Sequence, residues 1–166
     1  WNDMDMMEVG NGMTVEEDRS HFSLWAIMAS PLIAGNDLRS MSKATTKILT
    51  NKDMLAINQD PLGIQAMKWI DEGDIELYIK PLENGEYALL FLNRSDVARK
   101  YSLDWGFHYM KDDISKHEIF FNKQQFRWRD IWRGGKGKTS KKYSTKIPAH
   151  GVVVLRLTPL KQSKEK

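Results

Sequence analysis

The apolar residues of this chain change their spacing once, near Gly63, and this change limits the folds open to it. Before Gly63 they recur every three or four residues, which is the spacing of an amphipathic helix. After Gly63 they alternate with polar residues, as in Ile75, Leu77 and Ile79, which is typical of strands. The sequence therefore predicts a multi-domain chain with a helical part, an antiparallel β domain and a charged tail, at residues 1–63, 64–160 and 161–166.

The balance of charge changes at the same position. Residues 1–60 contain five Lys or Arg and nine Asp or Glu, whereas residues 61–166 contain twenty and thirteen. Two units with different surfaces account for such a change. The chain has no cysteine, which excludes disulfides, thiolate metal sites and cysteine nucleophiles within this stretch. No apolar run reaches the roughly 20 residues that cross a bilayer, so no membrane partner is expected.

The helical part has the order of the last units of a β/α repeat. Thr14 and Glu17 form a capping-box pattern, which predicts a helix that ends before Pro31. The apolar run at 32–35 is too short for a helix and is predicted to be a buried parallel strand. Two further short helical segments are expected, one capped by Ser42 and one at residues 55–57.

The β domain is predicted to be a sandwich of about eight strands, because short alternating segments and turn signals follow one another at regular spacing. One of the turn signals is an Asn-Gly pair at residues 84–85, which is typical of a hairpin. The expected strands lie at residues 65–70, 75–80, 87–92, 100–104, 118–121, 126–132, 142–147 and 152–157.

The acidic opening segment is the first candidate for chemistry. Trp1-Asn2-Asp3-Met4-Asp5-Met6 carries two carboxylates two residues apart, and functional groups of a β/α barrel lie where strands give way to loops. Asp5 is a candidate to accept hydrogen bonds from sugar hydroxyls, with Trp1 and Met6 as apolar surface for a pyranose ring. The spacing alone also fits a manganese-binding Asp-x-Asp of a glycosyltransferase and, most often, a solvated acidic loop. We also take Trp1 as a cut inside a domain, because no linker or cap precedes it.

Other polar motifs favour structural roles. Asn36-Asp37 follows the expected strand, but such a pair before a turn more often bonds its own backbone. The basic run at 133–138 lacks the ending of a phosphate loop and is predicted to be a solvated hairpin, so no nucleic acid is expected as a partner. Asn93-Arg94-Ser95 fits a glycosylation sequon.

The aromatic residues and the histidines are also expected to have structural rather than functional roles. Four aromatic residues are expected to fill the core of the β domain rather than to stack on sugars: Trp105, Phe107, Trp128 and Trp132. Four histidines show no metal-ligand spacing and are not expected to be catalytic: His21, His108, His117 and His150.

Six blocks of the first part, taken in order, resemble one known family. The blocks are Trp1-Asn2-Asp3-x-Asp5-Met6, Glu8-Val9-Gly10-Asn11-Gly12, Phe22-Ser23-Leu24-Trp25-Ala26, Ser30-Pro31-Leu32-Ile33, Asn36-Asp37-Leu38-Arg39 and Ala56-Ile57-Asn58-Gln59-Asp60-Pro61-Leu62-Gly63. They closely resemble glycoside hydrolase family 27, the α-galactosidases and α-N-acetylgalactosaminidases. Two later blocks resemble the β domain of that family: Arg129-Asp130-Ile131-Trp132 and Ile147-Pro148-Ala149-His150-Gly151-Val152-Val153-Val154-Leu155.

The resemblance implies a fold and a role for the opening block. The fold is the end of a (β/α)8 TIM barrel followed by an antiparallel β-sandwich, with the block at the end of the seventh barrel strand. There Asp5 would hydrogen-bond the galactose, and Met6 and Trp1 would line its pocket. The family usually has proline where this chain has Met4, which affects the rigidity of the loop more than the role of Asp5. The nucleophile and the acid/base lie on earlier strands in the family, so no catalytic residue is expected in this chain.

The resemblance also implies an activity. Family members hydrolyse terminal α-linked galactose of oligosaccharides, polysaccharides or glycoconjugates with retention, and no cofactor or metal is implied. The implied partners are an α-galactoside substrate and the missing amino-terminal barrel segment of the same protein. The alternatives are an α-N-acetylgalactosaminidase and a non-catalytic carbohydrate-binding β module. Relatives that meet polymeric substrates are typically extracytoplasmic, and the same location is expected here.

The isolated chain is expected to be inactive and to leave the apolar faces of its helices exposed to solvent. Few barrel strands are present, so the apolar faces around Phe22, Trp25, Ile48 and Leu55 are expected to be exposed unless the rest of the barrel is present.

Overall fold

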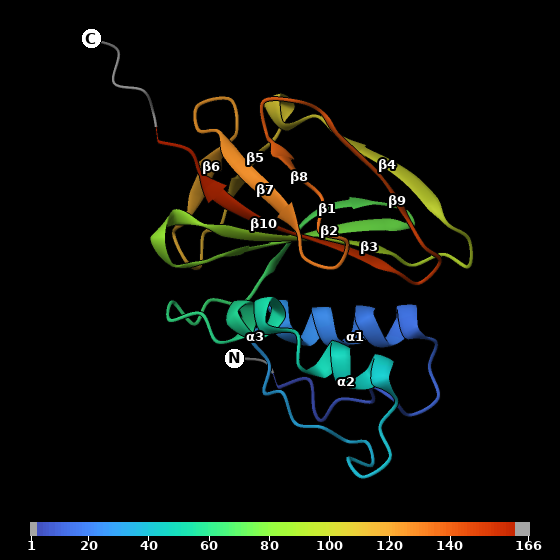
Figure 1. Cartoon of the computed structure of the whole chain (residues 1–166). Helices are drawn as coiled ribbons and strands as arrows, with labels where there is room; N and C mark the ends of the chain where they lie inside the picture. Colours follow the sequence, from blue (N-terminus) through green and yellow to red (C-terminus); the bar gives the residue numbers. More distant parts are fainter. Residues whose placement is uncertain (1–2, 162–166) are drawn as a thin grey trace.

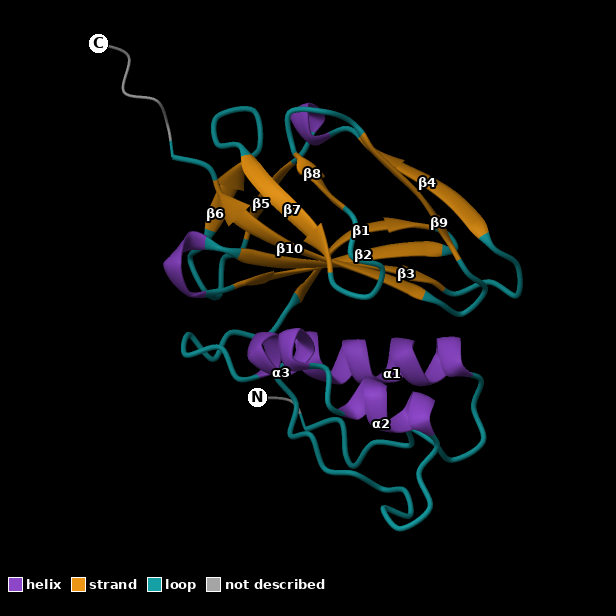
Figure 2. Cartoon of the chain, viewed as in Figure 1, coloured by secondary structure: helices purple, strands orange, loops and turns teal. Residues whose placement is uncertain are grey.

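The computed structural model describes residues 3–161 and arranges them in three layers (Figure 1). Helices form one layer, a six-stranded antiparallel sheet lies beside them, and two two-stranded sheets cover the other face of that sheet (Figure 2). The helices are α1 (Val15–Ile27), α2 (Lys43–Leu49) and α3 (Lys52–Asn58). The strands are β1 (Met67–Glu72), β2 (Ile75–Pro81), β3 (Tyr87–Asn93), β4 (Arg99–Leu103), β5 (Tyr109–Lys111), β6 (Glu118–Phe120), β7 (Phe126–Asp130), β8 (Lys136–Lys138), β9 (Tyr143–Ile147) and β10 (Val152–Pro159).

The helices begin where the sequence predicts. The Thr14 hydroxyl accepts the Glu17 amide hydrogen at 3.3 Å, and the Glu17 carboxylate accepts the Thr14 amide hydrogen at 2.8 Å. Both contacts of the capping box are therefore present at the start of α1. Ser42 caps α2 in the same way through the Thr45 amide at 3.0 Å. None of the described helices is both long and apolar enough to cross a membrane.

The large sheet has the strand order β1-β2-β3-β10-β7-β8, and the small sheets pair β4 with β9 and β5 with β6. The strands form an antiparallel β-sandwich, as the sequence predicts. The hairpin between β2 and β3 turns at Asn84 and Gly85, whose φ values are 61° and 69°. Only such left-handed backbone matches the twist of a tight hairpin, which is why Asn-Gly marked this turn in the sequence.

Both faces of the large sheet are buried. Leu89, Phe91, Val153 and Leu155 point toward the small sheets and form one core with their apolar residues. The alternate side chains of the same strands point toward the helices and form a second core: Ala88, Leu90, Val152 and Val154 pack there with Phe22, Ala26, Ile27 and Ile57. This double burial explains why β3 and β10 read as continuous apolar runs rather than as alternating ones.

The run at 32–35 is not the buried parallel strand that its sequence predicts. It makes one isolated parallel bridge, between Ala34 and Met7, and Ile33 is exposed. Parallel strands occur almost only in sheets whose two faces are both covered, and here Ile33 and Ala34 are exposed. Among the described residues, Met7 alone pairs with this run, so no ladder extends from the bridge.

The prediction that the helical faces would be exposed is wrong for two of the four residues and partly wrong for the others. Phe22 and Ile48 are buried, and Trp25 and Leu55 are partly buried against the same core. The chain's own β sheet covers α1 and α3 from one side (Figure 1). The boundary at residue 63 stays a prediction, because the second core joins residues from both sides of it.

Candidate functional site

The opening loop lies beside the run at 32–35. The Met7 amide donates to the Ile33 carbonyl at 2.7 Å, and the Gly35 amide donates to the Met7 carbonyl at 2.9 Å. A Cβ at Gly35 would lie 2.7 Å from the Met7 carbonyl oxygen and 3.1 Å from the Met6 sulfur. Glycine is therefore required at residue 35 for the two segments to approach, and the Met6 side chain lies over it.

Asp5 and Met6 present their side chains at the surface of this loop. Met6 is 50% exposed, as suits a residue proposed to line a pocket. Asp5 has a φ of 70°, a conformation that aspartate tolerates better than most residues. Its amide donates to Asp3 Oδ1 at 2.9 Å, and its own Oδ1 accepts the Met6 amide hydrogen at 2.7 Å. Among the described residues no hydrogen bond is made to Asp5 Oδ2, and the Asp5 residue is exposed.

Two side chains of α1 hold the backbone of the loop. Trp25 Nε1 donates to the Asp5 carbonyl at 2.8 Å, and the Glu8 amide donates to His21 Nε2 at 3.2 Å. The His21 and Trp25 rings are stacked, with centroids 3.7 Å apart and an angle of 18° between the planes. Burial lowers the pKa of His21, against the opposing effect of Glu8 and Asp18, which favours the neutral ring that can accept a hydrogen bond.

Sequence reasoning missed this pair. Helical spacing predicts Trp25 on the apolar face of its helix, and His21 is not expected to be catalytic because the histidines show no metal-ligand spacing. Their four-residue separation does place the two rings on one helical face, and that was the available signal. The contact of that face with a loop 20 residues earlier in the chain has no sequence signature.

Of the other predicted residues, some lie in the loops nearby and one cannot be placed. Trp1 lies outside the described residues. Asp37 is held locally: Arg39 donates to its two carboxylate oxygens at 2.9 and 3.0 Å, and the Arg39 amide donates to it at 3.0 Å. These bonds lower the pKa of Asp37. Asn36 lines a polar hollow of about 370 Å³ with Asp18, Ser42 and others. The local bonding that the sequence favours for Asn36-Asp37 is therefore present at Asp37.

The four aromatic residues do not share one role. Trp105 is buried in the core between the sheets and Trp128 is partly buried against it, as predicted, whereas Trp132 is partly buried against the core shared with the helices. Phe107 is 86% exposed, so the core prediction is wrong for this residue. It follows the buried Trp105 in a 3₁₀ turn capped by Asp104, and the turn directs the second ring outward.

The remaining motifs are structural. Asn93 is fully buried, and its side chain donates to the carbonyls of Val97 and Pro148, each at 2.8 Å, so the sequon is closed to glycosylation in the folded chain. The basic run forms the turn of the β7–β8 hairpin and all of β8, as predicted. No group of three or more acidic or histidine side chains among the described residues is arranged to hold a metal ion.

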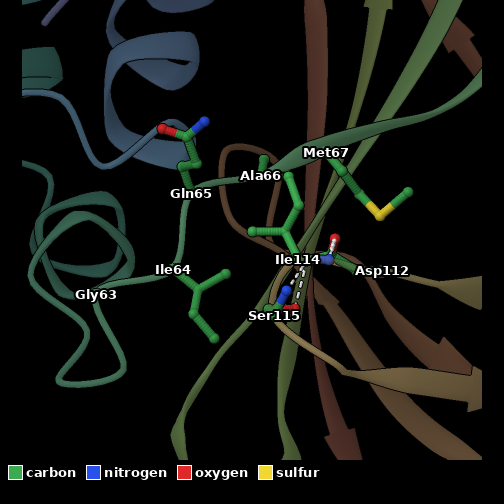
Figure 3. Close-up of a pocket in the computed structure, with 8 residues that line it drawn as sticks. All are labelled: Gly63, Ile64, Gln65, Ala66, Met67, Asp112, Ile114 and Ser115. Atoms are coloured by element: carbon green, nitrogen blue, oxygen red, sulfur yellow. Dashed lines mark hydrogen bonds between the residues drawn. The ribbon is translucent and has the colours of Figure 1, made fainter. Parts of the chain in front are cut away.

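A larger hollow lies where the helical part joins the sheet (Figure 3). It has a volume of about 540 Å³ and is lined by residues 63–67 on one side and by Asp112, Ile114 and Ser115 on the other. Asp112 is the one charged residue in the lining, and it bonds the amides of Ile114 and Ser115 at 3.0 and 3.2 Å. The carboxylate is therefore engaged in its own turn, and the hollow offers no reacting pair.

Comparison with known families identifies both parts of the chain. The model described as the alpha-galactosidase C-terminal beta sandwich domain matches residues 72–157, and the model described as alpha galactosidase A matches residues 1–60. The chain belongs to the α-galactosidases of glycoside hydrolase family 27. Its helical part corresponds to the end of the family's catalytic domain, and its sheets correspond to the family's β-sandwich.

Individual α-galactosidases are similar over nearly the whole chain. Alpha-galactosidase A of Cellvibrio japonicus is 74% identical over 96% of this chain, which covers 39% of that protein. The alpha-N-acetylgalactosaminidase of Gallus gallus is 47% identical over 61% of this chain and 26% of that protein. The crystal structure of alpha-galactosidase I from Mortierella vinacea superposes with a TM-score of 0.80 at 36% identity, over 95% of this chain and 39% of that one. The chain thus spans about two fifths of the length of these α-galactosidases.

Proposed function

We propose that the complete enzyme containing this chain is a retaining α-galactosidase that removes terminal α-linked galactose from oligosaccharides, polysaccharides or glycoconjugates. The observation that carries the proposal is the 74% identity to a protein named alpha-galactosidase A, which extends over 96% of the chain; the opening loop lies within the residues that match the family model. No cofactor or metal takes part in this proposal. An extracytoplasmic location belongs to it as well, and cell fractionation tests that part.

In this proposal the chain binds the sugar and does not break its glycosidic bond. The Asp5 carboxylate accepts hydrogen bonds from galactose hydroxyls, and the exposed Met6 side chain, with Trp1, lines the pocket. Retention requires two carboxyl groups about 5 Å apart across the anomeric carbon. Asp3 and Asp5 each use one carboxylate oxygen to bond a backbone amide of their own loop. This local role argues against a nucleophile and acid/base pair here, so both catalytic groups belong to the amino-terminal barrel segment.

The second candidate activity is hydrolysis of α-linked N-acetylgalactosamine. The 47% identity to the Gallus gallus alpha-N-acetylgalactosaminidase supports it, although that match covers less of this chain. A non-catalytic carbohydrate-binding module is less favoured, because residues 1–60 match a catalytic-domain model. Initial rates of the complete enzyme with the aryl α-galactoside and the aryl α-N-acetylgalactosaminide separate these candidates, and faster turnover of the second substrate would reverse the assignment.

The role of Asp5 is tested by Asp5→Asn in the complete enzyme. Loss of a charge-assisted hydrogen bond that strengthens toward the transition state should lower kcat/KM by about 10- to 150-fold, equivalent to roughly 1.5–3 kcal/mol. The matched control is Asp113→Asn, which removes an exposed carboxylate from the sandwich and should leave kcat/KM unchanged. Wild-type kinetics of Asp5→Asn would remove Asp5 from the sugar site.

A further inference from the structure

The Asp5 loop depends on α1 for its shape. Asp5 has left-handed backbone, with a φ of 70°, which for a residue with a side chain is held only where its surroundings enforce it. The two bonds that involve the Asp5 amide and carboxylate are made within residues 3–6. The bond from Trp25 Nε1 to the Asp5 carbonyl, at 2.8 Å, connects this peptide to α1, and the Met4 amide donates to Ser30 Oγ at 3.1 Å just before it.

The Trp25 ring is itself fixed by His21. The two rings stack at 3.7 Å, and His21 Nε2 accepts the amide hydrogen of Glu8 at 3.2 Å. The pair thus bonds the loop at two points, one on each side of Met6 and Met7. The stacking joins these two bonds, so a change of either ring alters the support of the other.

We propose that Trp25 and His21 are positioning residues for the substrate-binding carboxylate of Asp5. Trp25 fixes the peptide between Asp5 and Met6, and His21 holds Trp25 and the amide of Glu8. The inference rests on the proposed role of Asp5 in galactose binding. A displacement of about 1 Å in a group that contacts the reacting sugar is enough to lower a rate about 100-fold, so the support of the loop sets how effective Asp5 is.

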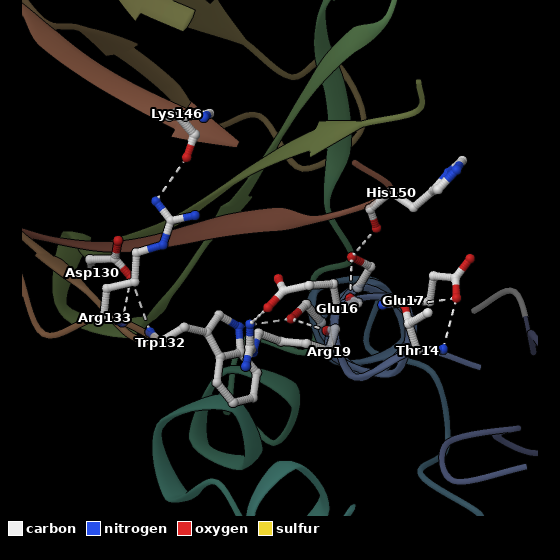
Figure 4. Close-up of polar contacts among 11 residues, drawn as sticks. Thr14, Glu16, Glu17, Arg19, Asp130, Trp132, Arg133, Lys146 and His150 are labelled. Atoms are coloured by element: carbon white, nitrogen blue, oxygen red, sulfur yellow. Dashed lines mark hydrogen bonds and ion pairs between the residues drawn. The ribbon is translucent and has the colours of Figure 1, made fainter. Parts of the chain in front are cut away.

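The test is Trp25→Phe in the complete enzyme, because phenylalanine keeps a ring against His21 and removes only the N–H donor and part of the ring. We expect kcat/KM for an aryl α-galactoside to fall about 10-fold or more. The matched control is Trp132→Phe. Trp132 Nε1 also donates to α1, to Ser23 Oγ at 3.0 Å (Figure 4), but it lies at the interface with the sheet. This control should lower the midpoint of thermal unfolding as much as Trp25→Phe does and leave kcat/KM unchanged.

A double substitution separates positioning from general stability. If Trp25 acts through Asp5, Trp25→Phe should change kcat/KM less than about 2-fold once Asp5→Asn is present, because the carboxylate it positions has gone. Equal effects in both backgrounds would contradict the inference, and so would wild-type kinetics of Trp25→Phe beside an impaired Asp5→Asn. Wild-type kinetics of Asp5→Asn would instead refute the proposed role of Asp5, and the positioning inference would fall with it.

His21 is tested by two substitutions, of which only one keeps a hydrogen-bond acceptor. His21→Gln keeps an acceptor for the Glu8 amide, and His21→Leu removes it at similar volume. We expect His21→Leu to lower kcat/KM more than His21→Gln does, with similar midpoints of thermal unfolding. The reverse order would show that the bond to Glu8 does not support the loop.

Discussion

The Lys80 amine is buried, and no described residue accepts a hydrogen bond from it. Its side chain is fully buried on the face of β2 that points to the helices. Burial lowers the pKa of Lys80 to about 8, with Asp60 acting in the opposite direction. Asp60 does not compensate fully, because its carboxylate already accepts the amide hydrogens of Leu62 and Glu83, both at 3.1 Å. The charged form of Lys80 therefore destabilises the fold at neutral pH.

Lys80→Met should increase the free energy of unfolding at pH 7 by about 1–3 kcal/mol, because it removes an unpaired buried charge at similar volume. In the parent chain the free-energy cost of burying the charged Lys80 amine is fully present below pH 8. It disappears as the pH rises from about 8 toward the ordinary value of 10.5, because the unfolded state then binds more protons than the native state. In urea unfolding, the difference in free energy of unfolding between the variant and the parent should be smaller at pH 9.5 than at pH 7. Lower stability of the variant at pH 7 would contradict an unpaired amine.

At the scale of elements, the two β-domain blocks that resemble the family lie on the contact between sheet and helices. Arg129 forms a double ion pair with Asp53 of α3 at 2.6 and 2.7 Å, and Trp132 bonds Ser23 of α1. Ser20 of α1 donates to the His150 carbonyl at 2.6 Å (Figure 4). Both blocks therefore join the helical part of the chain to the sandwich.

Trp132→Ala should lower the free energy of unfolding by about 3 kcal/mol, which is the low end for a tryptophan because the ring is only partly buried. It removes apolar contact with the second core and the bond to Ser23. Phe107→Ala is the control: this ring is 86% exposed, and its loss should change stability by less than about 0.5 kcal/mol. Chemical denaturation measures both, and an equal effect of the two would show that Trp132 does not join the layers.

In the β7–β8 hairpin the Trp128 ring packs directly against Gly137. A Cβ at Gly137 would lie 2.4 Å from Trp128 Cζ2, whereas one at Gly135 would lie 3.7 Å from the nearest atom of the same ring. Gly137→Ala should therefore destabilise the chain by about 1–3 kcal/mol, and Gly135→Ala should not. Thermal unfolding of the two variants measures the difference. Equal midpoints would mean that Trp128 moves away at no cost.

Most elements could be predicted from the sequence because local chemistry determines them. The capping box at Thr14 and the Asn84-Gly85 turn both depend on neighbouring residues, and both are present. The short strands β5 and β8 were missed. β8 consists of Lys136, Gly137 and Lys138, so it has no apolar residue to form an alternating pattern. For the opening loop, the sequence indicated Asp5 and Met6 but not their support by α1, which is a contact between distant segments.

At the scale of the whole molecule, the large sheet serves two cores at once. Its helix-facing side chains, such as Leu90 and Val154, are buried by α1 and α3 rather than by another sheet. The core between the large and small sheets contains residues of the β domain alone, whereas the second core is shared with the helices. The strand predicted at 32–35 is wrong because a buried parallel strand needs cover on both faces, whereas among the described residues Met7 alone pairs with this run and Ile33 is exposed.

We propose that this chain holds a sugar-binding carboxylate and that the catalytic pair lies in the amino-terminal barrel segment. The most direct test measures turnover of an activated aryl α-galactoside by residues 1–166 alone and by the complete enzyme at equal molar concentration. A cooperative urea transition of the isolated chain establishes that it is folded in the assay. We expect turnover by the complete enzyme and none above the buffer rate by the chain alone, because loss of the nucleophile removes the covalent route. Turnover by the purified chain would show that Asp3, Asp5 or Asp37 can catalyse, and would contradict the account.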